Sequence, residues 1–442
     1  MIVAIDIYQQ EYLSANEALM KRYILHQFPV KPRTYIALLL AILFTVVVIA
    51  FFIEITDYVQ LLFKQKARNY PLLSLIITPI TYVGIIYFTK LYFQRAESSG
   101  IPQVIATLDS RNKKIRLQLL SLRTALAKFS IIFLGMLGGA PIGIQGPCIY
   151  IGSSIFYSFN RFISLKRKIM IHSMIILGGC AGLIVAFNAP IAGFFFAYEE
   201  LGRKIRSQAL IFIAFGCGVV YLIATVYRGN LPYLKDLSGL LFEYTLIWQL
   251  IPLAIIAGLL GGLFSIILVF LIDKFTFNTA KKILATSLII GIIVGLFNYF
   301  SEFLISGSGK QEVMFMLDSQ SLGVEFILMK YFSVLTSVTS AIPGGLFLPT
   351  ISIGMGIGSE ASNLMPLFDP QVVMIMATIA YLSGAIRTPL TATFVTLEMT
   401  STMHLILPAL MVAFIANYVS RLIKKQPLYE TMADNYIKIT NP

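Results

Sequence analysis

The sequence predicts an all-α integral membrane protein built from two related halves. Of its 442 residues, 57% are hydrophobic and only 12% are charged, whereas soluble domains carry about 25% charged residues. The mean hydropathy is +0.81. The runs Tyr35–Ile53, Leu250–Ile272 and Ile283–Phe297 are long or apolar enough to cross or enter a bilayer. A soluble protein with one very large core does not account for this composition.

A repeat separated by 202 residues indicates the two halves. Pro147-Cys-Ile-Tyr-Ile-Gly152 returns as Pro349-Thr-Ile-Ser-Ile-Gly354, each time after a stretch rich in Gly and Pro. Downstream, the segment from Pro190 to Glu199 is matched by Pro389 to Glu398 with the same spacing. In membrane proteins, paired apolar segments interrupted by Gly or Pro point to a binding site at the interface between repeats.

Several apolar segments are too short for a span of roughly 20 residues. They are Ile101–Leu108, Cys148–Phe159, Pro190–Leu201, Phe347–Ile357 and Pro389–Thr400. Half-helices are tolerated in a membrane only where they are buried in protein or line a water-filled cavity. Each helix N-terminus presents unpaired N–H groups and about half a positive charge, so several that converge form an anion site. For one such segment, a kinked and tightly packed helix is the favoured explanation, but a repeated set favours the anion site.

The formal net charge of +13 is carried largely by basic clusters in loops. These clusters lie at 21–22, 111–116, 161–168, 203–206 and 421–425. Cationic loops usually mark the cytoplasmic side and set orientation, although Lys64, Lys66 and Arg68 would then fall outside. Excess positive charge also suits a protein whose permeant species is an anion, through steering at the pore mouths.

We therefore expect a multi-pass protein of the plasma (inner) membrane, without a cleavable signal peptide. The expected organisation is a cytoplasmic N-terminal segment over 1–33, a first membrane repeat over 34–230, a second over 231–425, and a C-terminal helix over 426–442.

Other residue types argue against enzymatic, metal-binding and nucleic-acid-binding functions. Cys148, Cys180 and Cys217 are an odd number without C-x-x-C spacing and are interpreted as packing residues. The histidines, His26, His172 and His404, belong to no H-E-x-x-H grouping, and no G-x-S-x-G elbow occurs. No nucleic-acid module is visible. A coupled cation transporter would want several acids within the spans, where Asp is nearly absent.

The chain resembles the CLC chloride channel and transporter family in motifs that follow the family's order: Ser99-Gly-Ile-Pro102, Gly143-Ile-Gln-Gly-Pro147, Gly345-Leu-Phe-Leu-Pro349 and Tyr429. The family patterns read G-S-G-I-P, G-K/R-E-G-P and G-x-F-x-P, with a tyrosine late in the chain. Phe187–Gly193 followed by Glu199 and Glu200, and Leu397–Thr400, are similar to further family stretches. The match runs from about Gln94 to Tyr429 and covers most of the chain.

The resemblance implies an inverted repeat within each subunit, about 18 helical segments, and a homodimer with one pore per subunit. The segments Pro190–Tyr227 and Pro389–Tyr418 would form the subunit interface. Larger relatives carry paired cytoplasmic regulatory domains, which we do not expect here. No cofactor is expected, and chloride or a similar small monovalent anion is the transported ligand.

By the same resemblance, chloride would be bound by the Ser99 hydroxyl, the Tyr429 phenol and the N–H groups of Leu346 and Phe347. Neutral donors hold an anion without a full counter-charge, so that it can leave again; a fixed Arg or Lys would bind it too tightly. Nitrate-preferring members carry proline at the position of Ser99, so serine favours chloride. The candidate anion-binding residues are Ser99, Gly100, Ile101, Pro102, Gly143, Ile144, Gln145, Gly146, Pro147, Gly345, Leu346, Phe347 and Tyr429.

Two positions depart from the family pattern. Ser98 replaces the first glycine of G-S-G-I-P, a mild change. Gln145 replaces the glutamate of G-K/R-E-G-P, which carries the proton in members that exchange chloride for protons; an amide cannot titrate. The inner proton-relay glutamate falls at Glu200, which is either functional or only a structural or entrance residue. Glu199 is interpreted, with Glu398, as a buried structural carboxylate.

Gln145 therefore occupies the gate position, and we expect chloride transport that is passive and not coupled to protons. The alternative is a chloride/proton antiporter with a different proton route, for example water chains from Glu200 past Tyr429. A fluoride-selective exchanger of the same family is more remote, because those members carry a different sequence in place of Gly143-Ile-Gln-Gly-Pro147.

Overall fold

The computed structural model describes residues 32–110, 112–160, 162, 168–202, 207–274, 279–318, 320–340 and 342–440. Most of the expected N-terminal segment 1–33 and the basic clusters at 21–22 and 203–206 lie outside these residues. Within them the chain is helical, and the only β-structure is one isolated bridge. The all-α prediction is therefore confirmed.

The helices are α2 (Pro32–Asn69), α3 (Pro71–Tyr92), α4 (Ile101–Asp109), α5 (Lys113–Leu119), α6 (Leu122–Leu137), α7 (Gln145–Phe159), α8 (Lys168–Phe187), α9 (Pro190–Phe196), α10 (Ser207–Arg228), α11 (Leu250–Lys274), α12 (Ala280–Phe300), α13 (Lys310–Leu317), α14 (Gly323–Thr339), α15 (Phe347–Ser362), α16 (Pro370–Ile386), α17 (Pro389–Thr400), α18 (Ile406–Ile423) and α19 (Leu428–Thr440). Short 3₁₀ turns lie at Gln94–Ala96, Tyr244–Gln249 and Met403–Leu405, and one π-helical turn lies at Ala197–Leu201.

The chain combines long apolar helices with short ones. In the described residues, seven helices are long and apolar enough to cross a membrane. The three apolar runs of the sequence lie in α2, α11 and α12. The short segments form α4, α7, α9, α15 and α17, each of which begins within two residues of a Pro or Gly. Proline in the first turn is compatible with a helix start, because the first N–H groups have no partner within the helix.

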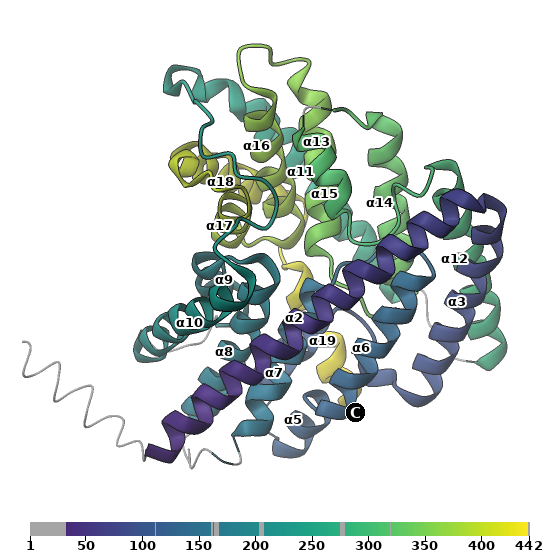
Figure 1. The fold of residues 1–442 in the computed structure, drawn as a ribbon, viewed down its shortest axis with the longest axis vertical. Coiled ribbons are helices and arrows are strands. Elements are labelled where there is room, and N and C mark those ends of the chain that lie inside the picture. The colour runs from purple at the N-terminus through teal and green to yellow at the C-terminus, as the bar shows by residue number, and fades with distance from the viewer. Residues whose placement is uncertain are drawn as a thin grey trace, which may run out of the picture.

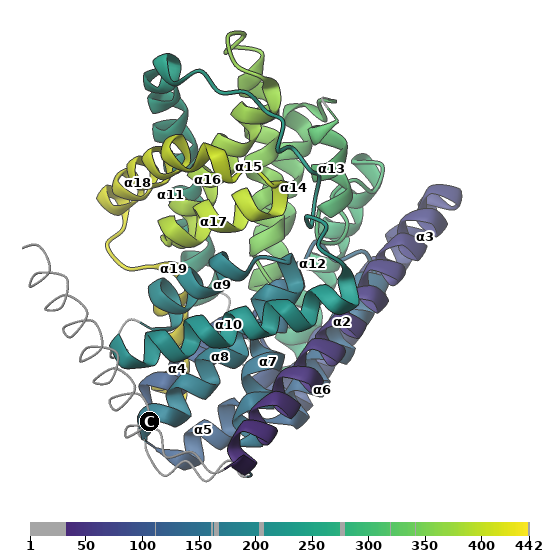
Figure 2. The same cartoon turned by 60° about the vertical axis from the view of Figure 1, so that its left-hand side comes forward.

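The two halves pack against each other along the molecule. Most first-half helices lie in the lower part of Figure 1 and most second-half helices in the upper part, while α2 runs diagonally upward across the view. The first-half helix α3 packs beside α12 across the boundary. Figure 2 shows that α19 runs back from the second half to α4 of the first. The C-terminal helix is thereby brought to a segment more than 300 residues earlier in the chain (Figure 2).

Glycines explain why the two hexapeptides match. A Cβ on Gly152 in α7 would lie 2.1 Å from the backbone oxygen of Gly178 in α8. At the matching position, a Cβ on Gly354 in α15 would lie 2.8 Å from the Cα of Thr378 in α16. Both contacts place helix backbones in direct contact, and only a residue without a side chain permits such an approach.

The matched glutamates cap each other's repeat. The Glu398 carboxylate in α17 accepts hydrogen bonds from the N–H groups of Ile191 (3.0 Å) and Ala192 (2.7 Å) at the start of α9. Glu199, which follows α9, accepts from the N–H groups of Leu390 (2.9 Å) and Thr391 (2.7 Å) at the start of α17. Each carboxylate thus satisfies exposed donors of the repeat-related helix and complements its dipole, which supports a structural role.

Candidate anion site

The two matched Gly-rich loops meet in the middle of the molecule. Gly143 and Gly345 form an isolated antiparallel bridge: the Gly143 N–H donates to the Gly345 oxygen at 2.9 Å, and the Gly345 N–H donates to the Gly143 oxygen at 2.6 Å. The bridge holds the starts of α7 and α15 together, because these helices begin two residues after each glycine. The N–H groups of both first turns have no partner within their own helices.

The start of α4 joins the same junction. Gly100 precedes α4 with φ of 102°, a left-handed conformation that favours glycine. A Cβ on Gly146 would lie 2.8 Å from the Cβ of Ser99 and 3.3 Å from the Cα of Gly345. Gly146 therefore lies against both Ser99 and Gly345, which brings three of the four predicted motifs together. Ile101 and Pro102 form the buried first turn of α4. Pro102 has no N–H group to donate, whereas Ile101 has a backbone N–H without a partner within the helix.

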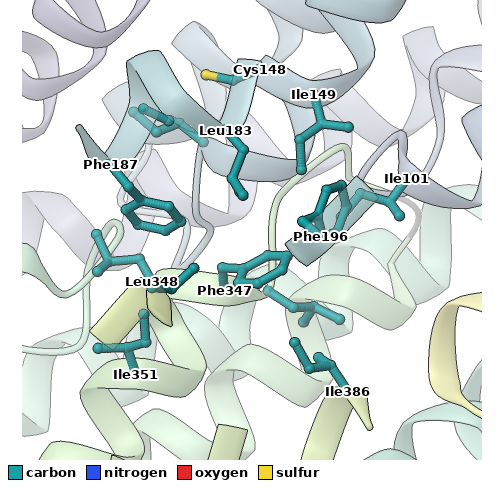
Figure 3. Close-up of a cluster of buried hydrophobic side chains, with 14 of the residues drawn as sticks. Ile101, Cys148, Ile149, Leu183, Phe187, Phe196, Phe347, Leu348, Ile351 and Ile386 are labelled. Atoms are coloured by element: carbon teal, nitrogen blue, oxygen red, sulfur yellow. The ribbon is translucent and has the colours of Figure 1, made fainter. Parts of the chain in front are cut away.

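Tyr429 completes the constellation from α19. Its ring stacks on that of Phe347, with centroids 6.4 Å apart. Phe347 in turn makes edge contacts with Phe187 and Phe196, at 6.2 Å and 5.9 Å. Figure 3 shows Phe347 between these two rings, surrounded by Ile101, Ile149 and Leu183. The site is therefore enclosed by apolar side chains, which exclude water and strengthen each polar interaction inside.

Two hydroxyl groups in this apolar shell are available for a ligand. The side chains of Ser99 and Tyr429 are 2% and 0% exposed. Neither hydroxyl oxygen has a hydrogen-bond partner among the described residues. Buried hydroxyls without partners are costly in an apolar environment, and an anion that accepts from both would remove that cost. Pro147 lies in the first turn of α7, and Leu346 immediately precedes α15.

Gln145 is the first residue of α7 and is fully buried. Its side chain lies beside the Tyr233 hydroxyl, and the Tyr233 ring makes an edge contact with Phe187 at 5.5 Å. Ile144, just before it, is also buried and replaces the Lys or Arg of the family motif. The α7 start thus lacks both the carboxylate and the cation of the pattern.

Glu200 lies in the π-helical turn that follows α9 and is 2% exposed. It interacts electrostatically with the Tyr429 hydroxyl. Single π-turns occur frequently at functional sites. The structure thus places the candidate inner relay glutamate on the Tyr429 side of the site, whereas Gln145 is beside Tyr233.

Sequence reasoning missed the polar groups that hold the Ser99 loop. The backbone oxygen of Glu97 accepts hydrogen bonds from the side-chain amide of Gln103 at 2.5 Å and from the Tyr436 hydroxyl at 3.2 Å. Tyr436 lies on α19, so the helix that carries Tyr429 is tied to the loop that carries Ser99. Lys128 in α6 binds the same loop. In the sequence, Lys128 could have been recognised only by its spacing from Lys330, which equals the spacing of 202 residues between the two hexapeptides.

A helical membrane protein with half-helix N-termini and buried hydroxyls around one enclosed point is an anion transporter in its general class. Residues 81–421 match the family model described as voltage gated chloride channel. The chain belongs to this family, the CLC family, whose members transport anions across membranes and are not enzymes. The family membership, the fold and the multi-pass membrane location predicted from the sequence are confirmed.

The chain is similar to named members of the family. It is 25% identical over 391 residues to the H(+)/Cl(-) exchange transporter ClcA of Vibrio parahaemolyticus, covering 82% of this chain and 79% of that protein. Over 396 residues it is 25% identical to ClcA of Salmonella paratyphi A, covering 86% and 80%.

Solved structures show the same fold. A slow cyanobacterial Cl⁻/H⁺ antiporter superposes with a TM-score of 0.82 at 24% identity, covering 93% of this chain and 100% of that chain. A CLC-type fluoride/proton antiporter superposes with a TM-score of 0.76 at 19% identity, covering 90% and 96%.

Proposed function

We propose that the protein conducts chloride passively down its electrochemical gradient, without proton exchange. The observation that carries this proposal is the buried carboxamide of Gln145 at the start of α7, beside the bridge between Gly143 and Gly345. A carboxylate here would compete with chloride for the helix N-termini when charged and carry a proton when neutral. Gln145 does neither, because an amide does not titrate.

The binding chemistry proposed for the anion is neutral. The Ser99 and Tyr429 hydroxyls and the first-turn N–H groups of α15, including those of Leu346 and Phe347, would donate to it. Partial charges of helix ends and hydroxyl dipoles are strong enough to replace hydration but weak enough to permit release. Serine at position 99 favours chloride over nitrate in this proposal.

A chloride/proton antiporter is the second candidate, and one contact favours it. Glu200 is buried and interacts electrostatically with Tyr429, so an intramembrane acid lies next to the proposed anion site. The relatives named above are exchangers by name. In this alternative, protons would pass from Glu200 beyond Tyr429 without Gln145. Fluoride selectivity is a more remote alternative.

Liposome flux separates these candidates. Purified protein is reconstituted, a chloride gradient is imposed, and chloride and proton movements are recorded together, with protein-free liposomes as the control. We expect a reversal potential equal to the chloride equilibrium value and no proton uptake above the control. Uphill proton movement driven by chloride would overturn the passive proposal in favour of the antiporter. Fluoride replacing chloride in the same assay tests the third possibility.

We also propose that two copies form a homodimer through the faces of α10 and α18. Large apolar side chains are exposed on both helices, among them Ile211, Phe215, Leu407 and Leu422. The reciprocal hydrogen bonds of Glu199 and Glu398 fix the starts of α9 and α17, which pack against α10 and α18. We expect light scattering to give the mass of two chains in mild detergent. A monodisperse monomer that remains active after reconstitution at high dilution would contradict the dimer.

A further inference from the structure

Three charged side chains from α2, α10 and α13 gather on the Gln145 side of the site. Lys310, the first residue of α13, has its ammonium nitrogen 3.9 Å from the Asp57 carboxylate of α2. Arg228, the last residue of α10, interacts electrostatically with both. The Lys310 and Asp57 side chains are 24% and 35% exposed, whereas Gln145 is fully buried. This charged cluster, in which two cations and one carboxylate leave positive charge in excess, is therefore partly open to solvent.

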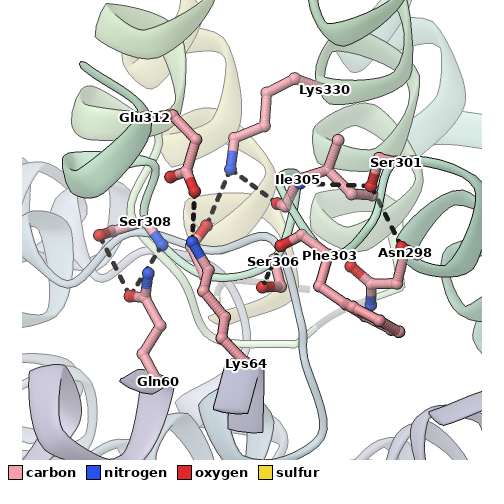
Figure 4. Close-up of polar contacts among 11 residues, drawn as sticks. Gln60, Lys64, Asn298, Ser301, Phe303, Ile305, Ser306, Ser308, Glu312 and Lys330 are labelled. Atoms are coloured by element: carbon pink, nitrogen blue, oxygen red, sulfur yellow. Dashed lines mark hydrogen bonds and ion pairs between the residues drawn. The ribbon is translucent and has the colours of Figure 1, made fainter. Parts of the chain in front are cut away.

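The face of α2 that carries the carboxylate also fixes the start of α13. Gln60 and Lys64 lie about one and two turns further along α2, on the same face. The Gln60 side-chain oxygen accepts hydrogen bonds from the N–H (3.2 Å) and the hydroxyl (3.3 Å) of Ser308, which closes that turn. Lys64 forms a buried ion pair with Glu312 (Figure 4). Lys310 lies between these two anchored positions of the chain, so its place on α2 is set by the fold.

Tyr233 connects the charged cluster to the gate position. The Lys310 nitrogen lies 4.2 Å from the centroid of the Tyr233 ring, which is a cation–π distance. The Tyr233 hydroxyl lies beside the Gln145 side chain, and the charges of Asp57 and Arg228 also act on Tyr233. The cluster is thus separated from the start of α7 by one aromatic ring.

The segment 229–243 between α10 and α11 holds Tyr233 in this place. Its Leu234 and Leu237 N–H groups donate to the backbone oxygens of Met399 and Thr400, each at 3.0 Å. These oxygens lie at the end of α17, and Tyr233 itself is 7% exposed. Backbone contacts therefore keep the ring between the ammonium group and the buried carboxamide.

Lys310 has partners that favour its charged form. Burial lowers the pKa of Lys310 below its usual value, and the Asp57 carboxylate opposes that shift. A nearby carboxylate and a ring face both stabilise an ammonium group, and the partial exposure of the side chain adds hydration.

We propose that anions enter the pathway at the charged cluster, where Lys310 supplies from the second repeat the positive charge that the start of α7 lacks. Ile144 stands where the family motif has Lys or Arg. A partly exposed cation raises the local concentration and the entry rate of a small monovalent anion. It does so without coordinating the anion at the inner site, where neutral donors permit release. This inference rests on the proposed anion transport, although not on whether transport is coupled to protons.

A double-variant cycle tests the role of charge. Chloride flux into liposomes is measured at subsaturating chloride and about 0.01 M ionic strength, where the Debye length is about 30 Å. Lys310→Met leaves the Asp57 carboxylate unpaired, and we expect flux to fall about fivefold. Asp57→Asn leaves both cations, and flux should rise about twofold. The double variant regains the net charge of wild type and should regain most of its flux. A double variant as slow as Lys310→Met would mean that the pair is only structural and would overturn the inference.

Ionic strength gives an independent measurement. The Debye length falls to about 3 Å at 1 M, so the deficit of Lys310→Met should shrink to less than about twofold in about 1 M potassium gluconate, balanced across the membrane. A fivefold deficit that persists at high ionic strength would contradict attraction at a distance. Lys310→Arg keeps the charge and should transport as wild type does at both ionic strengths.

A matched control lies on the segment 229–243. Lys235 pairs with Asp318 at 2.7 Å, and these side chains are 39% and 62% exposed. Because this pair is more exposed, Lys235→Met should change flux less than about twofold; a fivefold loss there would show that the effect is not specific to Lys310. If wild-type liposomes carry no chloride, the proposed transport itself fails. If wild type transports chloride and Lys310→Met equals it at low ionic strength, only the role of Lys310 fails.

Discussion

Replacing Gln145 by glutamate is expected to slow chloride flux at pH 7.5 by about tenfold or more. The side chain at this position starts α7 and is buried next to the bridge between the two repeats. A carboxylate there is attracted to the same N–H groups that would receive chloride, and it is tethered, so it competes at a high effective concentration. The measurement is chloride efflux from liposomes at matched protein density.

The pH dependence of Gln145→Glu identifies the mechanism. Protonation makes glutamic acid nearly isosteric with glutamine, so flux should return toward the wild-type value as the pH falls to about 4.5. Gln145→Met is the matched control, because it has similar length but cannot compete as an anion, and it should show no such recovery. Wild-type flux in Gln145→Glu throughout this pH range would contradict the proposed competition.

Replacing Gly146 by alanine is expected to weaken the affinity for the anion by about 100-fold or more. The added Cβ would lie 2.8 Å from the Cβ of Ser99, 3.0 Å from its backbone oxygen and 3.3 Å from the Cα of Gly345. Two of these three neighbours are backbone atoms and the third is a Cβ, so no flexible side-chain end can move away. Overpacking of this kind displaces the surrounding backbone, and here it separates the starts of α4, α7 and α15.

Bromide-soaked crystals test this prediction directly. Anomalous density is expected between Ser99, Tyr429 and the Leu346–Phe347 amides in wild type, and it should be absent in Gly146→Ala. Gly84→Ala is the control, since a Cβ on Gly84 in α3 would meet nothing within 4 Å. Alanine there should preserve binding and stabilise the helix by up to about 1 kcal/mol. Bromide density at the site in Gly146→Ala would show that the close backbone approach is not required.

Local patterns in the sequence determined the class of protein and the outline of the site. Apolar composition predicts a membrane protein, and the repeat separated by 202 residues predicts two halves. The Gly- and Pro-rich breaks before α4, α7 and α15 are visible because left-handed turns and helix starts restrict residue type within a few positions. The motifs that contain Ser99, Gly146 and Gly345 could therefore be recognised without coordinates.

Only the tertiary structure decided which groups meet across the halves. The exchange of caps between Glu199 and Glu398, and the closure of Ser308 by Gln60, join residues about 200 or more positions apart. No local preference encodes such pairs, because a carboxylate or carboxamide can satisfy any nearby donor once packing has brought the two together. Lys128 shows the same limit: its repeat spacing is in the sequence, but its direction is set by where the loop from Ala96 to Ser98 lies in the fold.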